Sequence, residues 1–524
     1  MSNPNIYDGK ALAKAVTKAY EQGQVDYRLE PLVLEDEMGK PVGTVKPGDS
    51  VVFCCRRGER EIELTEMFTD PHFAEIEREW LNDLTFVTLT RYHEKFKDIP
   101  VAFGPITVKN TLAECLSEAG KTQLHSAESE KFAHVTFFLN GGVYDAFPGE
   151  DRLLEPSIHG LFEEHPQLSA PEITDKVIGK LGDYDFVVLN YANGDVIGHT
   201  ESVEAKLGAI ACVSEQLGRL ATAAMEKDYV VLVTADHGNI EILKKPNGKA
   251  HVGHTTNLVP FVLADPRGDE PEKLLDGSLC DIAPTVLSIM GIEKPEAMTG
   301  KNLAPRHEFG KNRKVLLVIV DGFGIGSGDD NDAVHLAATP FWDQFKAAHV
   351  NSTLQASSRY VGLGEGKSGN SEAGHLNIGA GRVVAQDDCR IDQAIAEGDY
   401  QKNPALLMAI HNAKKRGKAL HLIGLLSKGS SHGSVDYPLT VLKMAKDEVD
   451  EIYFHLIVDG RSSEQGVTPQ NVIDLEKELD AIGAGVIVGC VGRGFALDRD
   501  KNYDKVKLAY DSMVLGEGTR YGNK

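Results

Sequence analysis

This sequence has little basic charge, few cysteines and no long apolar run, and each shortage excludes a class of protein. Its 524 residues hold 55 Lys and Arg against 78 Asp and Glu, a formal net charge of −23. That balance argues against a general nucleic-acid or membrane surface, although a small anionic substrate needs only a local cluster of arginines. No apolar run approaches the roughly 18 residues that span a bilayer. We therefore expect neither a nucleic-acid nor a membrane partner.

The seven cysteines are few, odd in number and without Cys-x-x-Cys spacing. The adjacent Cys54 and Cys55 are interpreted as buried thiols rather than a redox pair. This usage is typical of a reducing cytoplasm. The first residues, MSNPNIYDGKALAKAV, lack a charged segment followed by an apolar one, so no signal peptide is expected. The predicted location is the cytoplasm.

Apolar, strand-like runs alternate with helix-length segments over most of the chain. They are HVTFFLN (134–140), YDFVVLNY (184–191), YVVLVTA (229–235), VPFVLA (259–264), KVLLVIVD (314–321), ALHLIGLL (419–426), IYFHLIV (452–458) and GVIVGCV (485–491). Near-continuous apolar strands separated by helical segments favour parallel sheets covered on both faces. The sequence therefore predicts an α/β fold, and its length fits two domains.

Polar segments interrupt this pattern at two places. Residues 304–313, APRHEFGKNR, carry Pro305 and Gly310 and are predicted to be a linker. The strand that follows is typical of the first strand of a domain, although it begins only at residue 314. The chain ends on GEGTRYGNK, which is predicted to be a flexible polar tail.

Pairs of Asp and His follow two of the predicted strands. Asp236 and His237 end the strand in VVLVTADHGN, and in open α/β sheets ligand chemistry collects outside the carboxyl ends of strands. The alternative is a polar turn after a core strand. Asp195 and His199 share one helix face if Asp195 begins a helix. Alternatively, Asp195 caps the helix and His199 is a surface residue.

Two more histidines, His251 and His254, follow in KAHVGHTTNLVP. Two Asp/His pairs and a further His at successive strand ends make independent coincidence a poor explanation. Mixed oxygen and nitrogen ligands suit Mn²⁺ or Zn²⁺, and Mg²⁺ less well. The sequence therefore predicts a binuclear metal site.

A serine between glycines is a candidate nucleophile. KVLLVIVDGFG ends a strand on Asp321, and the glycine-rich GEGKSGNSEAGHLNIGAGR (364–382) contains Ser371. Two nearby cations would lower the pKa of the Ser371 hydroxyl and make it nucleophilic. The alternatives are a flexible loop and a phosphate-binding loop without covalent chemistry.

Arginines flank other strand ends, which is an unusual place for a merely solubilising charge. They are Arg57 and Arg60 in CCRRGER, Arg461 in DGR, and Arg493 and Arg499 in VGRGFALDRD. Several guanidiniums in one cleft would bind phosphate and carboxylate through bidentate hydrogen bonds. Structural ion pairs are the alternative for any single one. Lys131 and His432 are further candidates with weaker signals.

Together these motifs resemble the cofactor-independent phosphoglycerate mutases of the alkaline phosphatase superfamily. The matching stretches are VDGFG, GNSEAGHLNIGAGR, DGR, GRGFALDRD, EKFAHVTFFLNGG, NYANGDVIGHT, TADHGN, GHTTNLVPF and PEAMTGKNL. They span nearly the whole chain, but residues 314–524 resemble the family's first part and 1–303 its remainder. The chain thus resembles a circular permutant in which 304–313 joins the family's usual ends. Such a change is tolerated when the new termini fall in an exposed loop.

The resemblance implies a phosphatase-like domain over 106–385 and a smaller phosphotransferase domain formed by 386–524 plus 1–105, with hinges near 105 and 386 that close over substrate. It implies Ser371 as the residue that carries the phosphoryl group. The implied ligands are Asp195, His199 and His254 for one metal, and Asp321, Ser371, Asp236 and His237 for the other. The implied substrate-binding residues are Arg57, Arg60, Arg461, Ser462, Arg493, Arg499, His432 and Lys131.

The activity implied by the resemblance is interconversion of 3-phosphoglycerate and 2-phosphoglycerate, in glycolysis and gluconeogenesis. It needs two divalent ions, with Mn²⁺ expected and Zn²⁺, Co²⁺ and Mg²⁺ as alternatives, and no 2,3-bisphosphoglycerate. A monomer is expected. The rivals are a metal-dependent phosphomonoesterase and another mutase of the superfamily, against which the arginine set speaks. A third rival is a pseudoenzyme scaffold, which is disfavoured because all the implied ligand positions are intact.

Four departures from the family pattern bear on the substrate site. Ser462 stands where the family has an Asp that contacts glycerate, and Asp459 or Glu464 are candidate replacements. GSSHGS around His432 replaces GGVHSH, and RRGER replaces FRPDR while keeping both arginines. KSGNSEAGH replaces QMGNSEVGH, which places Lys367 near the nucleophile.

Overall fold

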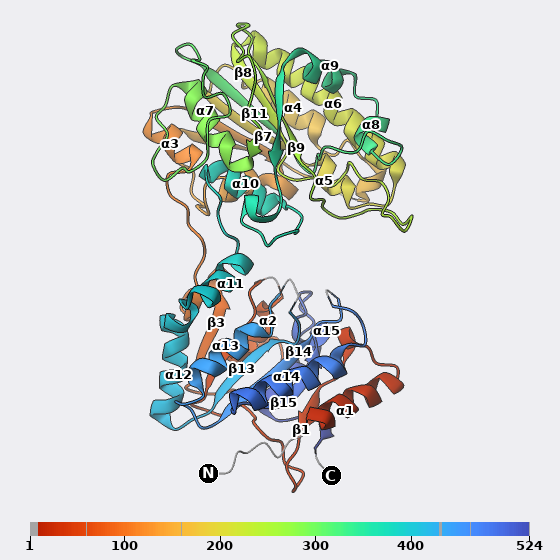
Figure 1. Ribbon diagram of the computed structural model, residues 1–524, viewed down its shortest axis with the longest axis vertical. Helices are drawn as coiled ribbons and strands as arrows, with labels where there is room; N and C mark the ends of the chain where they lie inside the picture. The colour runs from red at the N-terminus through yellow and green to blue at the C-terminus, as the bar shows by residue number, and fades with distance from the viewer. Residues whose placement is uncertain (1–8, 59, 159, 429–431, 462, 523–524) are drawn as a thin grey trace. The chain divides into compact units, whose positions relative to one another are not determined.

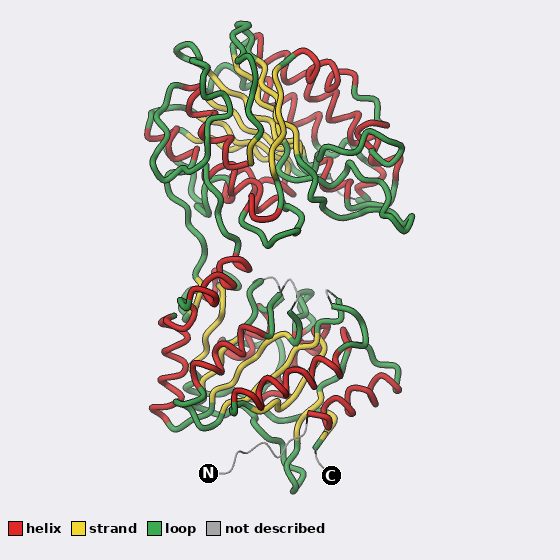
Figure 2. The backbone as a smooth tube through the Cα atoms, in the orientation of Figure 1, coloured by secondary structure: helices red, strands yellow, loops and turns green. Residues whose placement is uncertain are grey.

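Two separate sheets organise the computed structural model, which describes residues 9–58, 60–158, 160–428, 432–461 and 463–522. The chain divides into unit 1, Met1–Pro105 with Arg390–Lys524, and unit 2, Ile106–Cys389. Each unit contains one eight-stranded sheet with helices on its faces (Figures 1 and 2). None of the helices in the described part of the chain has the length and apolar character needed to span a bilayer.

The sheet of unit 2 has the strand order β10-β12-β9-β8-β11-β7-β5-β6. Its strands are β5 (Gln123–Glu128), β6 (Glu150–Glu155), β7 (Phe186–Tyr191), β8 (Tyr229–Thr234), β9 (Val259–Ala264), β10 (Gly277–Ser278), β11 (Lys314–Val320) and β12 (Val350–Gln355). β11 pairs in parallel with both β7 and β8, whereas β9 is antiparallel to β8 and β12. The carboxyl ends of β7, β11 and β8 therefore meet at one edge.

Helices cover both faces of this sheet, which is why its central strands are apolar throughout. The helices are α3 (Leu112–Glu118), α4 (Ala170–Ile178), α5 (Asn193–Gly198), α6 (Val203–Glu226), α7 (Ile282–Met290), α8 (Ala333–Leu336), α9 (Pro340–Ala348) and α10 (Ser371–Ala380). α4, α6 and α9 pack together in one layer, and α3, α7 and α10 form another (Figure 1). One continuous hydrophobic core includes side chains from both layers and from the strands between them.

The sheet of unit 1 has the strand order β16-β1-β15-β14-β13-β2-β3-β4. Its strands are β1 (Leu32–Leu34), β2 (Ser50–Phe53), β3 (Thr85–Thr90), β4 (Val101–Phe103), β13 (Leu420–Leu425), β14 (Ile452–Val458), β15 (Val486–Gly492) and β16 (Thr519–Tyr521). All neighbouring pairs are parallel except β1 with β15. Strands from both ends of the sequence thus share one sheet.

The helices of unit 1 also cover both faces of its sheet. They are α1 (Gly9–Glu21), α2 (Ile62–Thr69), α11 (Asp387–Glu397), α12 (Pro404–Arg416), α13 (Asp436–Ala445), α14 (Thr468–Ile482), α15 (Arg493–Ala496) and α16 (Tyr503–Val514). One hydrophobic cluster takes residues from α1, α12, α13 and α14, and a second takes residues from α2, α15 and α16. α11 begins within unit 2 and ends within unit 1.

The predicted α/β class is confirmed, and seven of the eight predicted strands are present. The predicted strand at 134–140 is wrong, because His134–Phe138 form a π-helical turn. The place beside β7 in the sheet is taken by β5, the preceding strand. Short apolar runs fit a buried helical turn as well as a strand, so periodicity could not separate the two.

The two polar segments are more ordered than the sequence predicted. In the predicted flexible tail, β16 pairs in parallel with β1, and the hydroxyl of Tyr521 donates to the carbonyl of Ile487 at 3.1 Å. Residues 304–313 contain neither helix nor strand, as a linker should. The segment nevertheless ends on a buried residue, Arg313, which forms an ion pair with Asp265.

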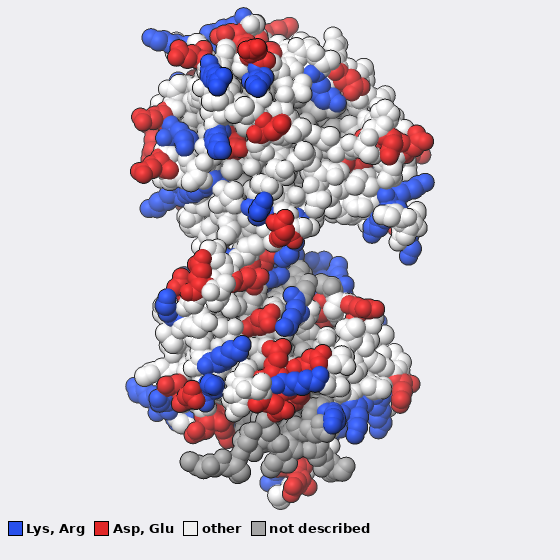
Figure 3. Space-filling model, in the orientation of Figure 1, with Lys and Arg blue, Asp and Glu red and all other residues white. Residues whose placement is uncertain are grey.

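The state of the cysteines and the mixture of charges on the surface agree with what the composition predicted. All seven cysteines are free, and Cys54 and Cys55 are fully buried. Burial raises the pKa of both thiols, which keeps them protonated and unreactive. On the face of each unit drawn in Figure 3, basic and acidic side chains are interspersed.

Candidate functional site

The Asp and His pairs of unit 2 converge at the edge where β7, β11 and β8 end. Asp236 and His237 follow β8 after Ala235, Asp321 comes directly after β11, and Asp195 lies in α5, which follows β7. Because these strands are parallel neighbours, segments distant in sequence reach one place. Ser371, the first residue of α10, lies among them.

The Ser371 hydroxyl contacts three ionisable side chains. The Lys131 amine donates to it at 2.6 Å, it donates to Asp321 Oδ1 at 3.2 Å, and His237 Nε2 lies 3.0 Å away. Ser371 is only 6% exposed. The side chain of Asn370 caps α10, so Ser371 occupies the helix N-terminus, which favours an anionic group.

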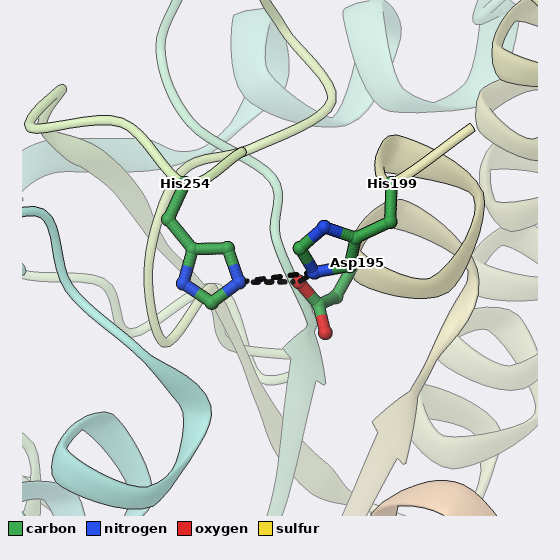
Figure 4. A group of neighbouring side chains, drawn as sticks. All are labelled: Asp195, His199 and His254. Carbon is green, nitrogen blue, oxygen red and sulfur yellow. Dashed lines mark hydrogen bonds and ion pairs between the residues drawn. The ribbon is translucent and has the colours of Figure 1, made fainter. Parts of the chain in front are cut away.

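Asp195, His199 and His254 form the first ligand group (Figure 4). The Nε2 atoms of His199 and His254 lie 3.2 and 3.0 Å from Asp195 Oδ1, and 3.2 Å from each other. Each Nδ1 faces a backbone carbonyl, Val252 O at 2.9 Å and Gly369 O at 2.7 Å, to which it can only donate. In its neutral form, each imidazole would therefore direct an Nε2 lone pair at the same point. Two lone pairs and a carboxylate oxygen repel one another unless a cation lies between them.

The second ligand group surrounds Asp321 and is fully buried. His237 Nε2 lies 3.4 Å from Asp321 Oδ1 and 3.6 Å from Asp236 Oδ2, and all three residues are 0% exposed. Asp236 Oδ2 is buried without a hydrogen-bond partner among the described residues. A buried carboxylate oxygen of this kind needs a counterion, and a mixed oxygen and nitrogen set fits a divalent transition metal. The site can therefore hold divalent metal.

Without a metal, the carboxylates of this site outnumber its positively charged side chains. Burial alone would lower the pKa of Lys131, but Asp321 and Asp195 raise it above its ordinary value. Burial alone would likewise raise the pKa of Asp236 and lower that of His237. Their mutual attraction reverses both shifts, and the carboxylates raise the pKa of His237 to about 10. Without a metal, three buried carboxylates thus face two positive side chains, Lys131 and a protonated His237.

Lys131 lies in this group and not with the arginines. Its amine also contacts Asp195 Oδ2 at 2.6 Å and Asp321 Oδ1 at 2.9 Å, so it connects the two ligand groups. It lies on a short helical turn directly before the π-helical turn of His134–Phe138. π-Helical turns are frequent at functional sites.

The predicted arginines lie in unit 1, at the carboxyl ends of β2, β14 and β15. Arg60 and Arg493 are buried, whereas Arg57, Arg461 and Arg499 are exposed. Burial lowers the pKa of Arg60, and the nearby charges of Arg499, Arg493 and Arg461 lower it further. Four of the five arginines are therefore close enough to repel one another, which an anionic ligand would relieve.

The two buried members of this cluster have different partners: the guanidinium of Arg60 donates to the carbonyl of Leu497 at 3.2 Å, and that of Arg493 contacts a carboxylate. Arg493 forms an ion pair with Asp459, and its Nε is buried without a hydrogen-bond partner among the described residues. Of the two candidate replacements for the family's Asp, Asp459 is therefore engaged with Arg493, and Glu464 is exposed. Ser462 lies outside the described residues.

His432 has a partner that sequence reasoning missed. Its Nδ1 lies 2.9 Å from Oε1 of Glu61, which is fully buried and directly precedes α2. The backbone N–H of Arg60 donates to the other oxygen of Glu61 at 3.1 Å. A carboxylate on Nδ1 fixes the tautomer of an imidazole and leaves Nε2 to accept a proton. Glu61 follows Arg60 directly in sequence, which is the signal that could have found it.

Other missed residues support the ligand groups. They are Asn190, Asn239 and His375, all 0% exposed. Asn239 donates to Asp195 Oδ1 at 3.0 Å, and Asn190 donates to Asp321 Oδ2 at 2.7 Å. His375 lies in the same glycine-rich stretch as Ser371, but neutral amides and a helix-borne histidine carry no ligand spacing of their own.

Comparison with known families places the chain among metal-dependent enzymes. The family model described as the Metalloenzyme superfamily matches residues 15–294, more than half of the chain, and the chain belongs to that superfamily. A second model, described as the BPG-independent PGAM N-terminus, matches residues 391–524. The first match contains Asp195, His199, Asp236, His237 and His254.

Several curated relatives carry the name 2,3-bisphosphoglycerate-independent phosphoglycerate mutase. The protein of Moorella thermoacetica is 46% identical over 293 residues, 56% of each chain. That of Clostridium novyi is 43% identical over 55% of this chain and 57% of its own. The relative named 2,3-bisphosphoglycerate-independent phosphoglycerate mutase 1 from Methanosarcina barkeri is 42% identical over 55% and 56%. The chain thus spans about half the length of the curated relatives it matches.

One solved structure, that of Leishmania mexicana phosphoglycerate mutase at low cobalt concentration, is also similar in part. It shares 28% identity over 51% of this chain and 52% of its own, with a TM-score of 0.41. A structural similarity of that size carries no argument about this chain.

Proposed function

We propose that this chain is a metal-dependent phosphoglycerate mutase that interconverts 3-phosphoglycerate and 2-phosphoglycerate without 2,3-bisphosphoglycerate. The observation that carries the proposal is the Ser371 hydroxyl, buried at the start of α10 within hydrogen-bond distance of Lys131, His237 and Asp321. The names of the curated relatives and the match at residues 391–524 support the same reaction.

Two divalent ions, with Mn²⁺ expected, would be held by the two ligand groups. Asp195, His199 and His254 would hold one, and Asp321, Ser371, Asp236 and His237 would hold the other. When bound, these ions would lower the pKa of the Ser371 hydroxyl and neutralise phosphoryl oxygens. The fit of the site to cations rests on Asp236 Oδ2, which is buried without a hydrogen-bond partner among the described residues, and on the converging Nε2 atoms of His199 and His254.

The chain's own groups would position the reactants. The Lys131 amine, 2.6 Å from Ser371 Oγ, would stabilise negative charge on that oxygen and on the attached phosphoryl group. The N-terminus of α10 adds a favourable dipole. In unit 1, Arg57, Arg60, Arg461, Arg493 and Arg499 would bind phosphate and carboxylate, and His432, oriented by Glu61, would contact the glycerate. Exclusion of water would keep the phosphoserine from hydrolysis.

We further propose that unit 2 corresponds to a phosphatase-like domain, 106–385, and unit 1 to a phosphotransferase domain, 386–524 plus 1–105. The order of the two is proposed to be circularly permuted. In support, the segment that matches a family N-terminus lies at residues 391–524, after the match at 15–294. Such a permutation would preserve the site, since β11 pairs with β7 and β8 whatever the order of synthesis.

A coupled assay for 2-phosphoglycerate tests the reaction, with 3-phosphoglycerate and Mn²⁺ and without added 2,3-bisphosphoglycerate. Ser371→Ala should lower turnover roughly 1000-fold or more, because no other residue carries the phosphoryl group. Glu372→Ala, at the exposed next residue of α10, is the matched control and should be close to unchanged. Mutase activity in Ser371→Ala with metal still bound would refute the mechanism, and free phosphate as the main product would indicate a phosphomonoesterase instead.

A further inference from the structure

Behind the second ligand group lies a buried chain of hydrogen bonds that joins Asp321 to the backbone of Ser371 through Asn190 and His375, neither of which is a predicted ligand. The amide nitrogen of Asn190 donates to Asp321 Oδ2 at 2.7 Å, and the same nitrogen lies 3.0 Å from His375 Nε2. His375 Nδ1 in turn lies 2.8 Å from the backbone carbonyl of Ser371. Asn190, His375 and Asp321 are all 0% exposed.

The chemistry of each contact allows a single arrangement of protons. The Ser371 carbonyl can only accept, so His375 carries its proton on Nδ1 and presents a lone pair at Nε2. Both neighbours of the Asn190 amide are then acceptors, so its nitrogen must face them. The opposite orientation would place the Asn190 oxygen against a carboxylate and a lone pair. The orientation of Asn190 is therefore set from both ends.

This arrangement decides which oxygen of Asp321 is available. Oδ2 is occupied by Asn190, whereas Oδ1 faces Ser371 Oγ at 3.2 Å, Lys131 at 2.9 Å and His237 at 3.4 Å. His375 Nδ1 also lies 3.3 Å from Asp236 Oδ2, the carboxylate oxygen that lacks a hydrogen bond. The network thus touches both carboxylates of the second group and the first turn of α10.

We propose that Asn190 and His375 are positioning residues for the metal ion of the Asp321 group: they occupy Oδ2 of Asp321 and anchor the start of α10, so that Oδ1 and the Ser371 hydroxyl face one point. This inference rests on the ligand groups of the proposed function. The first group has a different support, since Asn239 donates to Asp195 Oδ1 at 3.0 Å. Asn190 and Asn239 therefore form a matched pair, one buried amide for each ligand group.

Mn²⁺ titration by calorimetry, without substrate, tests the assignment. In a His254→Ala background, which disables the first group, the remaining ion reports on the Asp321 group. Adding Asn190→Ala should weaken Mn²⁺ binding about 10- to 100-fold, the usual effect of losing an outer partner of a ligand. Adding Asn239→Ala should change it by less than about threefold. In an Asp321→Asn background the order of the two effects should reverse. Equal effects of both substitutions, or an Asn190→Ala effect below threefold, would overturn the proposal.

His375 supplies a second test that does not depend on Asn190→Ala folding. His375→Gln places an amide oxygen near the former Nε2, so it can still accept from Asn190 and should keep Mn²⁺ affinity within about threefold. His375→Leu cannot accept a hydrogen bond from Asn190, so it should weaken Mn²⁺ binding as much as Asn190→Ala does. The double variant with Asn190→Ala and His375→Leu should bind Mn²⁺ only slightly more weakly than either single variant, because both residues act through one network. Full additivity would refute the coupling.

These outcomes are separable from the fate of the proposed function. A wild-type chain that binds two Mn²⁺ ions but has no mutase activity would refute the proposed reaction while the titrations still test the positioning role. A wild-type chain that binds no Mn²⁺ would overturn both.

Discussion

The two ligand groups of unit 2 share a similar set of side chains but differ in their exposure to solvent. Asp321, Asp236 and His237 are fully buried, whereas the His199 and His254 side chains are 47% and 20% exposed. Water can replace a lost ligand in the exposed group but has no access to the buried one. Burial therefore makes one group costly to disturb and leaves the other accessible to water.

The buried group also needs more support. Its carboxylates are held by Lys131, Asn190 and His375, and any gap leaves a charge without compensation in a medium of low polarity. The exposed group shares Lys131 through Asp195 and otherwise relies on two backbone carbonyls and Asn239. Substitutions should accordingly have large effects in the buried Asp321 group and modest ones in the exposed group of Asp195, His199 and His254.

Removing Lys131 should have the largest effect on stability, since it leaves Asp195 and Asp321 without their shared cation. Lys131→Met should cost about 3–5 kcal/mol of unfolding free energy in the metal-free protein. Lys206→Met is the control, because Lys206 is equally buried but donates to a single carbonyl, His251 O at 2.6 Å. Urea unfolding in excess chelator measures both. The loss of unfolding free energy in Lys131→Met should be smaller in the presence of Mn²⁺. Equal losses for Lys131→Met and Lys206→Met would contradict the idea that Lys131 matters because it compensates two buried carboxylates.

A direct comparison of the two groups comes from one histidine in each. His237→Ala should weaken binding of one Mn²⁺ ion by at least about 100-fold, whereas His199→Ala should weaken binding of the other by about tenfold. The reason is that water can take the place of an exposed imidazole. Calorimetric titration of each variant provides the measurement. If His199→Ala proved the more damaging, exposure would not be what separates the groups.

Acid should destabilise the folded chain through His134, whose ring lies against that of His375, with the centroids 5.4 Å apart. Burial, together with the charges of His375 and Lys131, lowers the pKa of His134 to about 3. Because this is below the value of about 6.5 in the unfolded chain, stability is complete above pH 6.5 and is lost as pH falls towards 3. A drop to pH 5 should cost about 2 kcal/mol from this residue. His134→Gln should reduce the loss between pH 7 and 5 in urea titrations, and the exposed His335→Gln should not.

The smallest effect is expected at Lys367, the departure nearest to Ser371. Its amine contacts Asp388 Oδ2 at 2.5 Å, but the lysine side chain is 50% exposed. Exposed ion pairs contribute less than about 1 kcal/mol, so Lys367→Met should change the unfolding free energy by no more than that. A thermal melt in low and high salt tests it. A loss comparable with that of Lys131→Met would show that this loop matters more than its exposure suggests.

Much of the fold was readable from local patterns. Apolar, β-branched runs such as 229–235 and 314–321 became central strands, since a parallel strand covered on both faces must be apolar throughout. The residues that end those runs were also readable, because the carboxyl ends of parallel neighbours meet at one edge. Asp236 and Asp321 follow such strands and lie together in the structure, whereas their grouping with Ser371, which follows a loop, was implied by the family resemblance. Their roles as ligands and nucleophile remain predictions.

Long-range partners settled what local patterns left open. In the run at 134–140, His134–Phe138 form a π-helical turn, and β5 takes the place beside β7. Near the end of the chain, Thr519–Tyr521 form an edge strand that pairs with β1. Nothing within either segment distinguishes these outcomes from a strand or a flexible tail.

Residue types and strand ends could thus be assigned from the chain alone, because they depend on periodicity and on the chemistry of single side chains. Proton positions and carboxylate orientation could not. The lone pairs of His199 and His254 are directed by Val252 and Gly369, and the free oxygen of Asp321 is selected by Asn190, all through contacts between segments far apart in sequence. A hydrogen bond of this kind exists only once the fold has brought its two ends together.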